Sequence, residues 1–438
     1  MSAIMTVSKL PMKPEKARWE RLAAPLEDIT VLDLTVALAG PVATLLLGGL
    51  GARVIKIENP VEGDPCRNNP PYIGANGVSL SRQLPDDISL SAINRLRNKL
   101  GITLNLKHEM ARQVFADLAR KADMLVQNFS PGVLDRLGIG YEAVHEINPR
   151  LVYCSISGFG SDAGAGPTKA LDTAIQALSG IMNVSGEEGD PPVRLGLPIA
   201  DLSVALFSVI GVLAALHQAQ RTGVGQHVDV SMLGSLTSLV ASEPYDAMEM
   251  CGAAVRTGQS FQRLAPFGVF PSQDGYVAIC AYTDAFAHAL FRIMKREDLI
   301  TDARFATRDQ RVRNFRELDS VIGAWTSSLS ISQIMSHLHG ADIPAAVVRD
   351  AKTAVHDAAA VARHDTLPLK HPKYQRRPHT GEPDDTPYGM GMPIKFSAAR
   401  ADFDEPPPEL GQHNEMVYAD VLRYDAARIR ELKRNGVI

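Results

Sequence analysis

The sequence is poor in cysteine, in aromatic residues and in surplus charge of either sign. Its 438 residues include 4 cysteines and 6% aromatic residues, and the formal net charge is −4. So few cysteines, with no CxxC pair among them, exclude a disulfide framework and indicate a reducing, cytoplasmic compartment. Without a basic surplus, a nucleic-acid-binding protein is not expected.

Long hydrophobic runs are also missing. No apolar stretch reaches the roughly 18 residues that a transmembrane helix needs, so no membrane partner is expected. The first 27 residues contain lysine and arginine but no apolar segment of a secretory signal, and we predict a loosely held N-terminal arm over 1–27. With 45% hydrophobic and 21% charged residues, the composition is that of a globular protein.

Apolar strands and helices alternate through the first half of the chain. The segments 29–35 and 53–58 are strand-like, and the apolar segment 41–50 between them is helical. This β-α-β pattern repeats to about residue 235, which predicts parallel strands in an α/β fold. We therefore expect a large Rossmann-like domain over 28–235.

The composition changes after residue 235. We predict a linker over 236–264 and a smaller α/β domain over 265–366. The segment 367–393 is rich in proline, glycine and charged residues, which is typical of a linker. The last segment, 394–438, is predicted to return to the large domain.

Several familiar cofactor and catalytic motifs are absent. The turn after the first strand, Val36–Gly40, lacks the GxGxxG glycines of a dinucleotide site. There is no HExxH metal motif and no GxSxG nucleophile motif, so we expect neither a bound metal nor a permanent cofactor. Two aspartates, Asp172 and Asp201, stand at the starts of predicted helices. Each could be a simple helix cap, or a rigidly held carboxylate close to backbone N–H donors.

Nine segments in order resemble one enzyme family, the class III CoA-transferases. This group includes formyl-CoA transferase and carnitine CoA-transferase, with alpha-methylacyl-CoA racemase as a relative. The segments are VLDLTVALAGPVAT (31–44), LGARVIKIENPVEGDPCR (50–67), NKLGITLNLKH (98–108), ADMLVQNFSPGVLDRLGIGYE (122–142), NPRLVYCSISGFG (148–160), AIQALSGIM (174–182), TGVGQHVDVSM (222–232), APFGVF (265–270) and LGQHNEMV (410–417).

The resemblance implies an interlocked homodimer and a covalent mechanism. Asp201 matches the nucleophile, which would form an aspartyl anhydride and then an aspartyl-CoA thioester. Asp172 matches a supporting acid. The turn Gly258-Gln259 and the backbone near Leu38-Ala39 would stabilise the oxyanions.

Contacts to coenzyme A are implied in the same way. The matching residues are Ala37, Leu38, Ala39, Asn59, Lys99, Leu104, Asn128, Phe129, Arg136, Leu137 and Met232. Arg136 would bind phosphate, for which its guanidinium is suited. Because formyl-CoA transferase has arginine at the place of Asn59, some phosphate contacts could shift to Arg67, Arg95, Arg97 or Lys99.

The departures from the family pattern bear on the reaction. Leu38 and the loop 256–260 do not support oxalate/formate exchange. Arg256 or Arg263 could hold the second carboxylate of a dicarboxylic acyl-CoA, and transfer within one molecule is also open. A racemase is the first alternative, but Leu171 stands where its acid/base partner would be, and leucine cannot move a proton. A non-catalytic CoA-binding protein is the second.

Overall fold

The computed structural model describes residues 23–162, 169–261, 263–373, 386–403 and 405–438, so most of the predicted arm lies outside the described residues. The chain forms two compact units. The larger contains the described residues up to Asp172, with Ile199–Ser235 and Val355–Ile438; the smaller contains Thr173–Pro198 and Leu236–Ala354. The predicted boundaries need correction, because 173–198 and 236–264 pack with the smaller unit.

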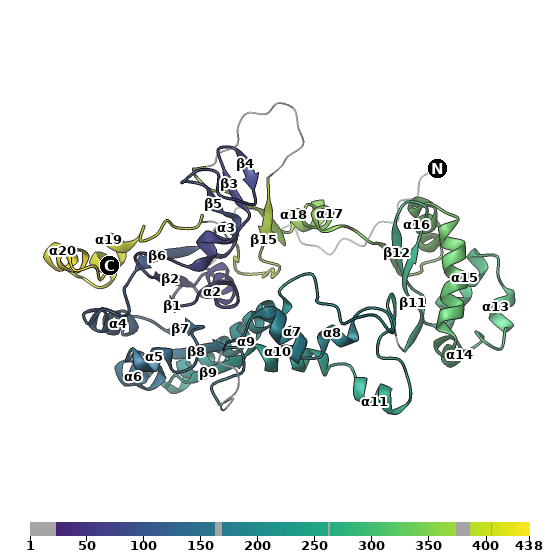
Figure 1. The fold of residues 1–438 in the computed structure, drawn as a ribbon, viewed down its shortest axis with the longest axis horizontal. Helices are drawn as coiled ribbons and strands as arrows, with labels where there is room; N and C mark the ends of the chain where they lie inside the picture. Colours follow the sequence, from purple (N-terminus) through teal and green to yellow (C-terminus); the bar gives the residue numbers. More distant parts are fainter. Residues whose placement is uncertain (1–22, 163–168, 262, 374–385, 404) are drawn as a thin grey trace. The chain divides into compact units, whose positions relative to one another are not determined.

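The larger unit is built on a six-stranded sheet in the order β6-β2-β1-β7-β8-β9 (Figure 1). The strands are β6 (Lys99–Thr103), β2 (Arg53–Glu58), β1 (Thr30–Asp33), β7 (Met124–Gln127), β8 (Val152–Ser157) and β9 (His227–Ser231). Every neighbouring pair is parallel. The predicted α/β fold with a parallel sheet is confirmed.

The strand order reverses between β1 and β7. From β1 the chain proceeds outward through β2 and β6, and from β7 it proceeds in the other direction through β8 and β9. In open parallel sheets, such a reversal leaves a crevice at the carboxyl ends of the two central strands, where ligands bind. The loops that follow Asp33 and Gln127 border this crevice.

Helices cover both faces of this sheet. The helices α2 (Ala39–Gly49) and α9 (Ile199–Thr222) pack against each other on one face. On the other face, the alternating residues Leu32 and Leu34 of the β1 segment join a core with α4 (Ala111–Ala119), α6 (Tyr141–Ile147) and α20 (Ala426–Arg434). The helix α9 is long and apolar enough to cross a membrane, and in the single chain one side of it packs against α2, β8 and β9.

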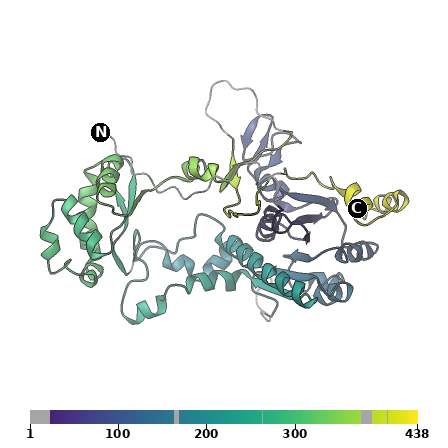
Figure 2. The same cartoon turned by 180° about the vertical axis from the view of Figure 1, so that it is seen from behind.

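The C-terminal segment packs beside the edge strand β6, as both views show (Figures 1 and 2). The Gly101 N–H donates to His413 Nδ1 at 3.0 Å, and the Thr103 N–H donates to Asn414 Oδ1 at 2.8 Å. The Tyr418 hydroxyl donates to the Thr103 carbonyl at 2.6 Å. These contacts cover part of an otherwise open strand edge.

Shorter elements complete the larger unit. They are η1 (Pro65–Asn68), β3 (Tyr72–Gly74), β4 (Gly77–Ser79), β5 (Ile88–Ser89), α3 (Leu90–Arg95), α5 (Val133–Arg136), α18 (Ala358–Ala362), β14 (Thr366–Pro368), β15 (Tyr388–Met390), α19 (Asn414–Met416) and the π-helical turn η2 (Val417–Val421). β3, β4 and β5 form a small antiparallel sheet just before α3.

The smaller unit has an antiparallel sheet in the order β10-β11-β12-β13. The strands are β10 (Ser260–Phe261), β11 (Leu264–Pro271), β12 (Tyr276–Cys280) and β13 (Ala345–Val347). Its helices are α8 (Ile181–Val184), α11 (Tyr245–Met250), α12 (Asp284–Ile293), α13 (Asp298–Thr301), α14 (Arg308–Arg313), α15 (Phe315–Ser327) and α16 (Ile331–Gly340). The helices α7 (Asp172–Leu178), α10 (Met232–Val240) and α17 (Ala351–Val355) run across the boundaries of the two units.

Candidate active site

The loop after β1 is held from three sides. The Asn128 side chain accepts from the Val36 N–H at 2.8 Å and donates to the Val36 carbonyl at 2.9 Å. The Ala37 N–H donates to Asp64 Oδ1 at 3.0 Å, and Arg95 donates to the Ala37 carbonyl at 3.0 Å. These bonds fix Ala37 at a φ of 67°, a left-handed conformation that a residue with a Cβ adopts at a cost.

A buried cluster of charged side chains lies under this loop. Lys99 Nζ pairs with Asp33 Oδ2 at 2.9 Å, and Lys56 Nζ pairs with Asp64 Oδ2 at 2.9 Å; all four side chains are 0% exposed. Lys56 also donates to the Thr35 carbonyl. Burial opposes ionisation of Asp33, but Lys56 and Lys99 outweigh it and hold the Asp33 pKa at about 2.

This cluster corrects one predicted contact. Lys99 also donates to the Pro41 carbonyl and the Thr44 hydroxyl, so all three of its N–H donors have partners inside the protein. A fully enclosed ammonium group cannot reach a phosphate of coenzyme A. Lys99 instead anchors the start of α2 to β1.

The two candidate aspartates lie close together at the start of α9. Asp172 begins α7, and its Oδ1 accepts from the Ala200 N–H at 2.8 Å. It therefore caps the helix whose first turn carries Asp201. Burial raises the pKa of Asp201 to about 6; the negative charge of Asp172 adds to this rise and Arg95 opposes it.

Arg95 connects Asp201 with the loop after β1. The same guanidinium binds the Ala37 carbonyl and attracts the Asp201 carboxylate electrostatically. The loop Val36–Ala37, Arg95 and the aspartate pair therefore share one neighbourhood in the larger unit. The first turn of α2 begins there too, and its cap residue Leu38 makes no side-chain cap hydrogen bond. The site thus combines a carboxylate of raised pKa, a cation and uncapped helix amides.

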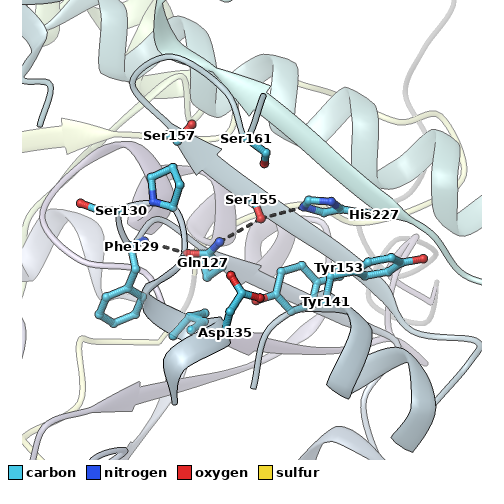
Figure 3. A pocket seen from close by; sticks show the side chains of 13 residues that line it. Gln127, Phe129, Ser130, Asp135, Tyr141, Tyr153, Ser155, Ser157, Ser161 and His227 are labelled. Atoms are coloured by element: carbon cyan, nitrogen blue, oxygen red, sulfur yellow. Dashed lines mark hydrogen bonds between the residues drawn. The ribbon is translucent and has the colours of Figure 1, made fainter. Parts of the chain in front are cut away.

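A cavity of about 180 Å³ opens where β7, β8 and β9 lie side by side (Figure 3). Across it, Gln127 Nε2 donates to Ser155 Oγ at 2.9 Å, and Ser155 Oγ lies 2.8 Å from His227 Nε2. Gln127 Oε1 accepts from the Phe129 N–H at 2.8 Å. These side chains fix the Asn128-Phe129 segment, which in turn holds the loop after β1.

The turn that contains Gly258 and Gln259 belongs to the smaller unit. The Gly258 N–H donates to the Gly186 carbonyl at 3.0 Å, so this amide is already engaged and does not fit the predicted role of an oxyanion donor. Gly258 has a φ of 59°, a left-handed conformation that favours glycine. Gln259 is exposed, and its carbonyl accepts from the Val269 N–H.

Both arginines predicted to bind a second carboxylate have partners. Arg256 donates to the backbone carbonyls of Asp190 and Pro191. Arg263 pairs with the Glu243 carboxylate at 2.8 Å through a forked contact. Neither guanidinium offers an open fork to a substrate, so the prediction for this pair is not supported.

The other predicted CoA contacts differ in their exposure. Leu104 and Met232 are buried, at 1% and 6% exposure, and Leu104 is part of the core. Asn59 accepts from the Val61 and Glu62 N–H groups, which leaves its amide nitrogen for a ligand. Arg136 is exposed, whereas Phe129 and Leu137 are half-buried against the core.

Sequence reasoning missed the roles of Asp33, Lys56 and Asp64. A signal was present, because Asp33 and Lys56 each lie between apolar residues, in VLDL and VIKI. An ionisable side chain inside such a strand needs a buried partner. Which partner it takes depends on pairing between β1, β2 and β6, and local patterns do not specify that pairing.

Known proteins resemble this chain over most of its length. The model of the CoA-transferase family III matches residues 26–414. A mouse succinyl-CoA:glutarate CoA-transferase is 31% identical over 415 residues, covering 94% of this chain and 90% of that protein. A succinyl-CoA:mesaconate CoA-transferase of Haloarcula marismortui is 35% identical over 350 residues (78% and 85%), and an acetyl-CoA:oxalate CoA-transferase of Acetobacter aceti is 36% identical over 341 residues (78% and 85%).

Solved structures share the same fold. A CAIB/BAIF family protein from Brucella suis superimposes with a TM-score of 0.76 at 30% identity, covering 91% of this chain and 100% of that one. Rv3272 from Mycobacterium tuberculosis gives a TM-score of 0.72 at 26% identity, covering 90% and 99%.

Proposed function

Because the chain belongs to the CoA-transferase family III, we propose that it moves coenzyme A from an acyl-CoA donor to a carboxylic acid through covalent intermediates on Asp201. The observation that carries this proposal is the placement of Asp201. It lies in the first turn of α9, beside the crevice loop and Arg95, with a pKa raised by burial to about 6. At neutral pH this carboxylate is ionised yet poorly solvated, as a nucleophile should be.

The reaction begins with attack of a carboxylate oxygen of Asp201 on the thioester carbonyl. The carbon–sulfur bond breaks, CoA thiolate leaves and an aspartyl anhydride remains. The thiolate then attacks the aspartyl carbonyl, which releases the donor acid and leaves an aspartyl-CoA thioester. An acceptor carboxylate runs the same steps in reverse, so no water, oxidant or reductant is consumed.

Each tetrahedral intermediate needs donors for its oxyanion. In the larger unit we assign this role to the backbone amides of Leu38 and Ala39 at the start of α2, where the cap residue makes no side-chain hydrogen bond and the helix dipole favours negative charge. Asp172 acts as a positioning residue, since its carboxylate holds the Ala200 N–H and so fixes the turn that carries Asp201.

We further propose that the acids are small and dicarboxylic. The relatives are named for glutarate, mesaconate, citramalate and oxalate. All four are short acids with two carboxyl groups. The homodimer, the cytoplasmic location and the choice between transfer within one molecule and between two molecules stay predictions.

A half-reaction with donor alone tests the proposal. Mixed with a panel of acyl-CoAs and no acceptor, the enzyme should release a burst of about one donor acid per site as aspartyl-CoA forms. Asp201→Asn should lose the burst and lower steady-state transfer about 1000-fold or more. Asp190→Asn is a matched control and should keep both. A wild-type enzyme that shows no burst and no transfer, but exchanges an alpha proton with deuterated water, would be a racemase instead.

A further inference from the structure

Arg95 is a cation of the loop neighbourhood that forms no ion pair with another described residue. It ends α3, is half-buried, and makes one hydrogen bond within the described part of the chain, to the Ala37 carbonyl. No carboxylate oxygen among the described residues lies within ion-pair distance of it. Burial lowers the pKa of Arg95 below its ordinary value, which reflects this incomplete compensation.

The neighbouring arginines have other tasks. Arg67 makes a forked pair with Glu58, with Nη2 2.7 Å from Oε2. Arg97 is 5% exposed; it donates to the Met390 carbonyl at 2.6 Å and stacks on Phe403. A guanidinium has five N–H donors, and Arg95 uses one of them in its hydrogen bond to the neutral carbonyl of Ala37. The rest of its fork can receive a ligand.

The position of Arg95 in the site indicates which anionic group of the substrate it binds. Arg95 binds the peptide of Ala37 and acts electrostatically on Asp201, so it lies at the reacting end of the substrate. The pantetheine arm separates the thioester from the phosphates of coenzyme A. A guanidinium at this end therefore faces the acyl group, and the anion that an acyl group can carry is a second carboxylate.

Resting on the proposed function, the geometry points to Arg95 as the residue that binds the distal carboxylate of a dicarboxylic acyl group. Donor and acceptor acids occupy the site in turn, so the same guanidinium binds the distal carboxylate of each. The planar fork matches a carboxylate in a bidentate contact. A monocarboxylic acid of equal length would leave the half-buried cation without its partner and would be disfavoured.

The test is an internal competition between two acceptors. Glutarate and pentanoate, equal in chain length and differing in one carboxyl, are mixed at equal concentration with one acyl-CoA donor. Both acceptors react with the same aspartyl-CoA, so the ratio of glutaryl-CoA to pentanoyl-CoA reports the acceptor step alone. The wild-type ratio should exceed one, a result that needs no variant.

Substitutions then assign the preference to a residue. Arg95→Gln should lower the product ratio about 10- to 100-fold, chiefly through loss of glutaryl-CoA, and Arg95→Lys should give an intermediate ratio. Arg120→Gln, which removes an exposed arginine paired with Asp117, and Arg263→Gln should keep the wild-type ratio.

Two outcomes would overturn the inference. If Arg95→Gln lowers both products equally, Arg95 serves coenzyme A or the fold rather than the acid. If Arg263→Gln changes the product ratio and Arg95→Gln does not, Arg263 rather than Arg95 binds the distal carboxylate. Absence of both products from the wild-type enzyme is a different result, because it removes the proposed function itself.

Discussion

Asp201 depends on its neighbours for its chemical state. Burial and the charge of Asp172 favour its protonated form, while Arg95 favours the carboxylate. The balance leaves the Asp201 pKa near 6, below neutral pH but well above that of an ordinary aspartate. We therefore expect the activity to fall below about pH 6, as the nucleophile takes up a proton.

Asp172→Asn tests whether the charge of Asp172 raises the Asp201 pKa and so sets the pH below which activity falls. Asparagine can keep the hydrogen bond to the Ala200 N–H but removes the negative charge, so the Asp201 pKa should fall and the acidic limb of the pH–rate profile should move to lower pH. Arg95→Gln should move the limb to higher pH. The measurement is kcat/KM from pH 4.5 to 8, with Asp298→Asn as an exposed control. A limb that stays in place in both variants would contradict the assignment.

The same carboxylate should cost stability. Its folded pKa, about 6, lies above the ordinary value of 3.8, so the native state binds more protons than the unfolded state between these values. Stability therefore falls as the pH rises from about 4 to 6 and stays lower above that window. Asp201→Asn should be more stable than the wild type by about 1–3 kcal/mol at pH 8 and show no such gain at pH 4. Urea unfolding at both pH values measures the difference; an equal gain at both would rule out this linkage.

At the scale of elements, the site depends on how two loops meet. The loops after β1 and β7 are joined by Asn128, and the buried pairs Lys99–Asp33 and Lys56–Asp64 hold the first loop from below. Removing one member of such a buried pair leaves the other charge buried without a partner, which destabilises the fold. The loop thus owes its position to the cluster as much as to its own residues.

Lys56→Met is the direct test of that dependence. It leaves the buried carboxylates of Asp33 and Asp64 with one less cation, and should lower the free energy of unfolding by about 3–5 kcal/mol. Arg296→Gln, which breaks an exposed pair with Asp298, should cost at most about 1 kcal/mol. Equal losses in the two variants, measured by urea unfolding, would show that the cluster is not a stabilising element.

Sequence patterns predicted the elements better than the contacts between them. The β-α-β units of the first 235 residues follow from apolar periodicity, and α7 begins at Asp172 as predicted. The helix α9 begins at Ile199, so Asp201 lies in its first turn and is not its cap residue. The engagement of the Gly258 N–H and the burial of Lys99 could not be predicted. Both depend on partners distant in sequence, Gly186 and Asp33, which only the folded chain brings close.

At the scale of the whole molecule, the two compact units do not follow the predicted domain boundaries, because the chain passes between them several times. The chain leaves the larger unit after Asp172, returns at Ile199, leaves again after Ser235 and returns at Val355. Each crossing lies at a helix, α7, α9, α10 or α17, so no change of composition marks it. The described residues of the proline-rich segment, 367–373 and 386–393, by contrast belong to the larger unit.

An exposed apolar face on α9 bears on assembly. Leu206 and Ile210, one turn apart, are 55% and 64% exposed in the single chain. We expect a particle of about twice the 47.3 kDa chain mass in solution, with this face covered by the second copy. Ile210→Glu should lower the measured mass toward that of one chain, whereas Val78→Glu on β4 should not. Light scattering after size-exclusion chromatography measures the particle mass of both variants. A dimer in both would place the interface elsewhere.

Peptide mass spectrometry of the enzyme, mixed with an acyl-CoA donor and quenched in acid, tests whether Asp201 forms the covalent intermediate. We expect a coenzyme A adduct, sensitive to hydroxylamine, on the peptide that carries Asp201, and no adduct in Asp201→Asn. A hydroxylamine-sensitive adduct on any other residue, or CoA transfer at the wild-type rate by Asp201→Asn, would contradict the assignment of Asp201 as the nucleophile.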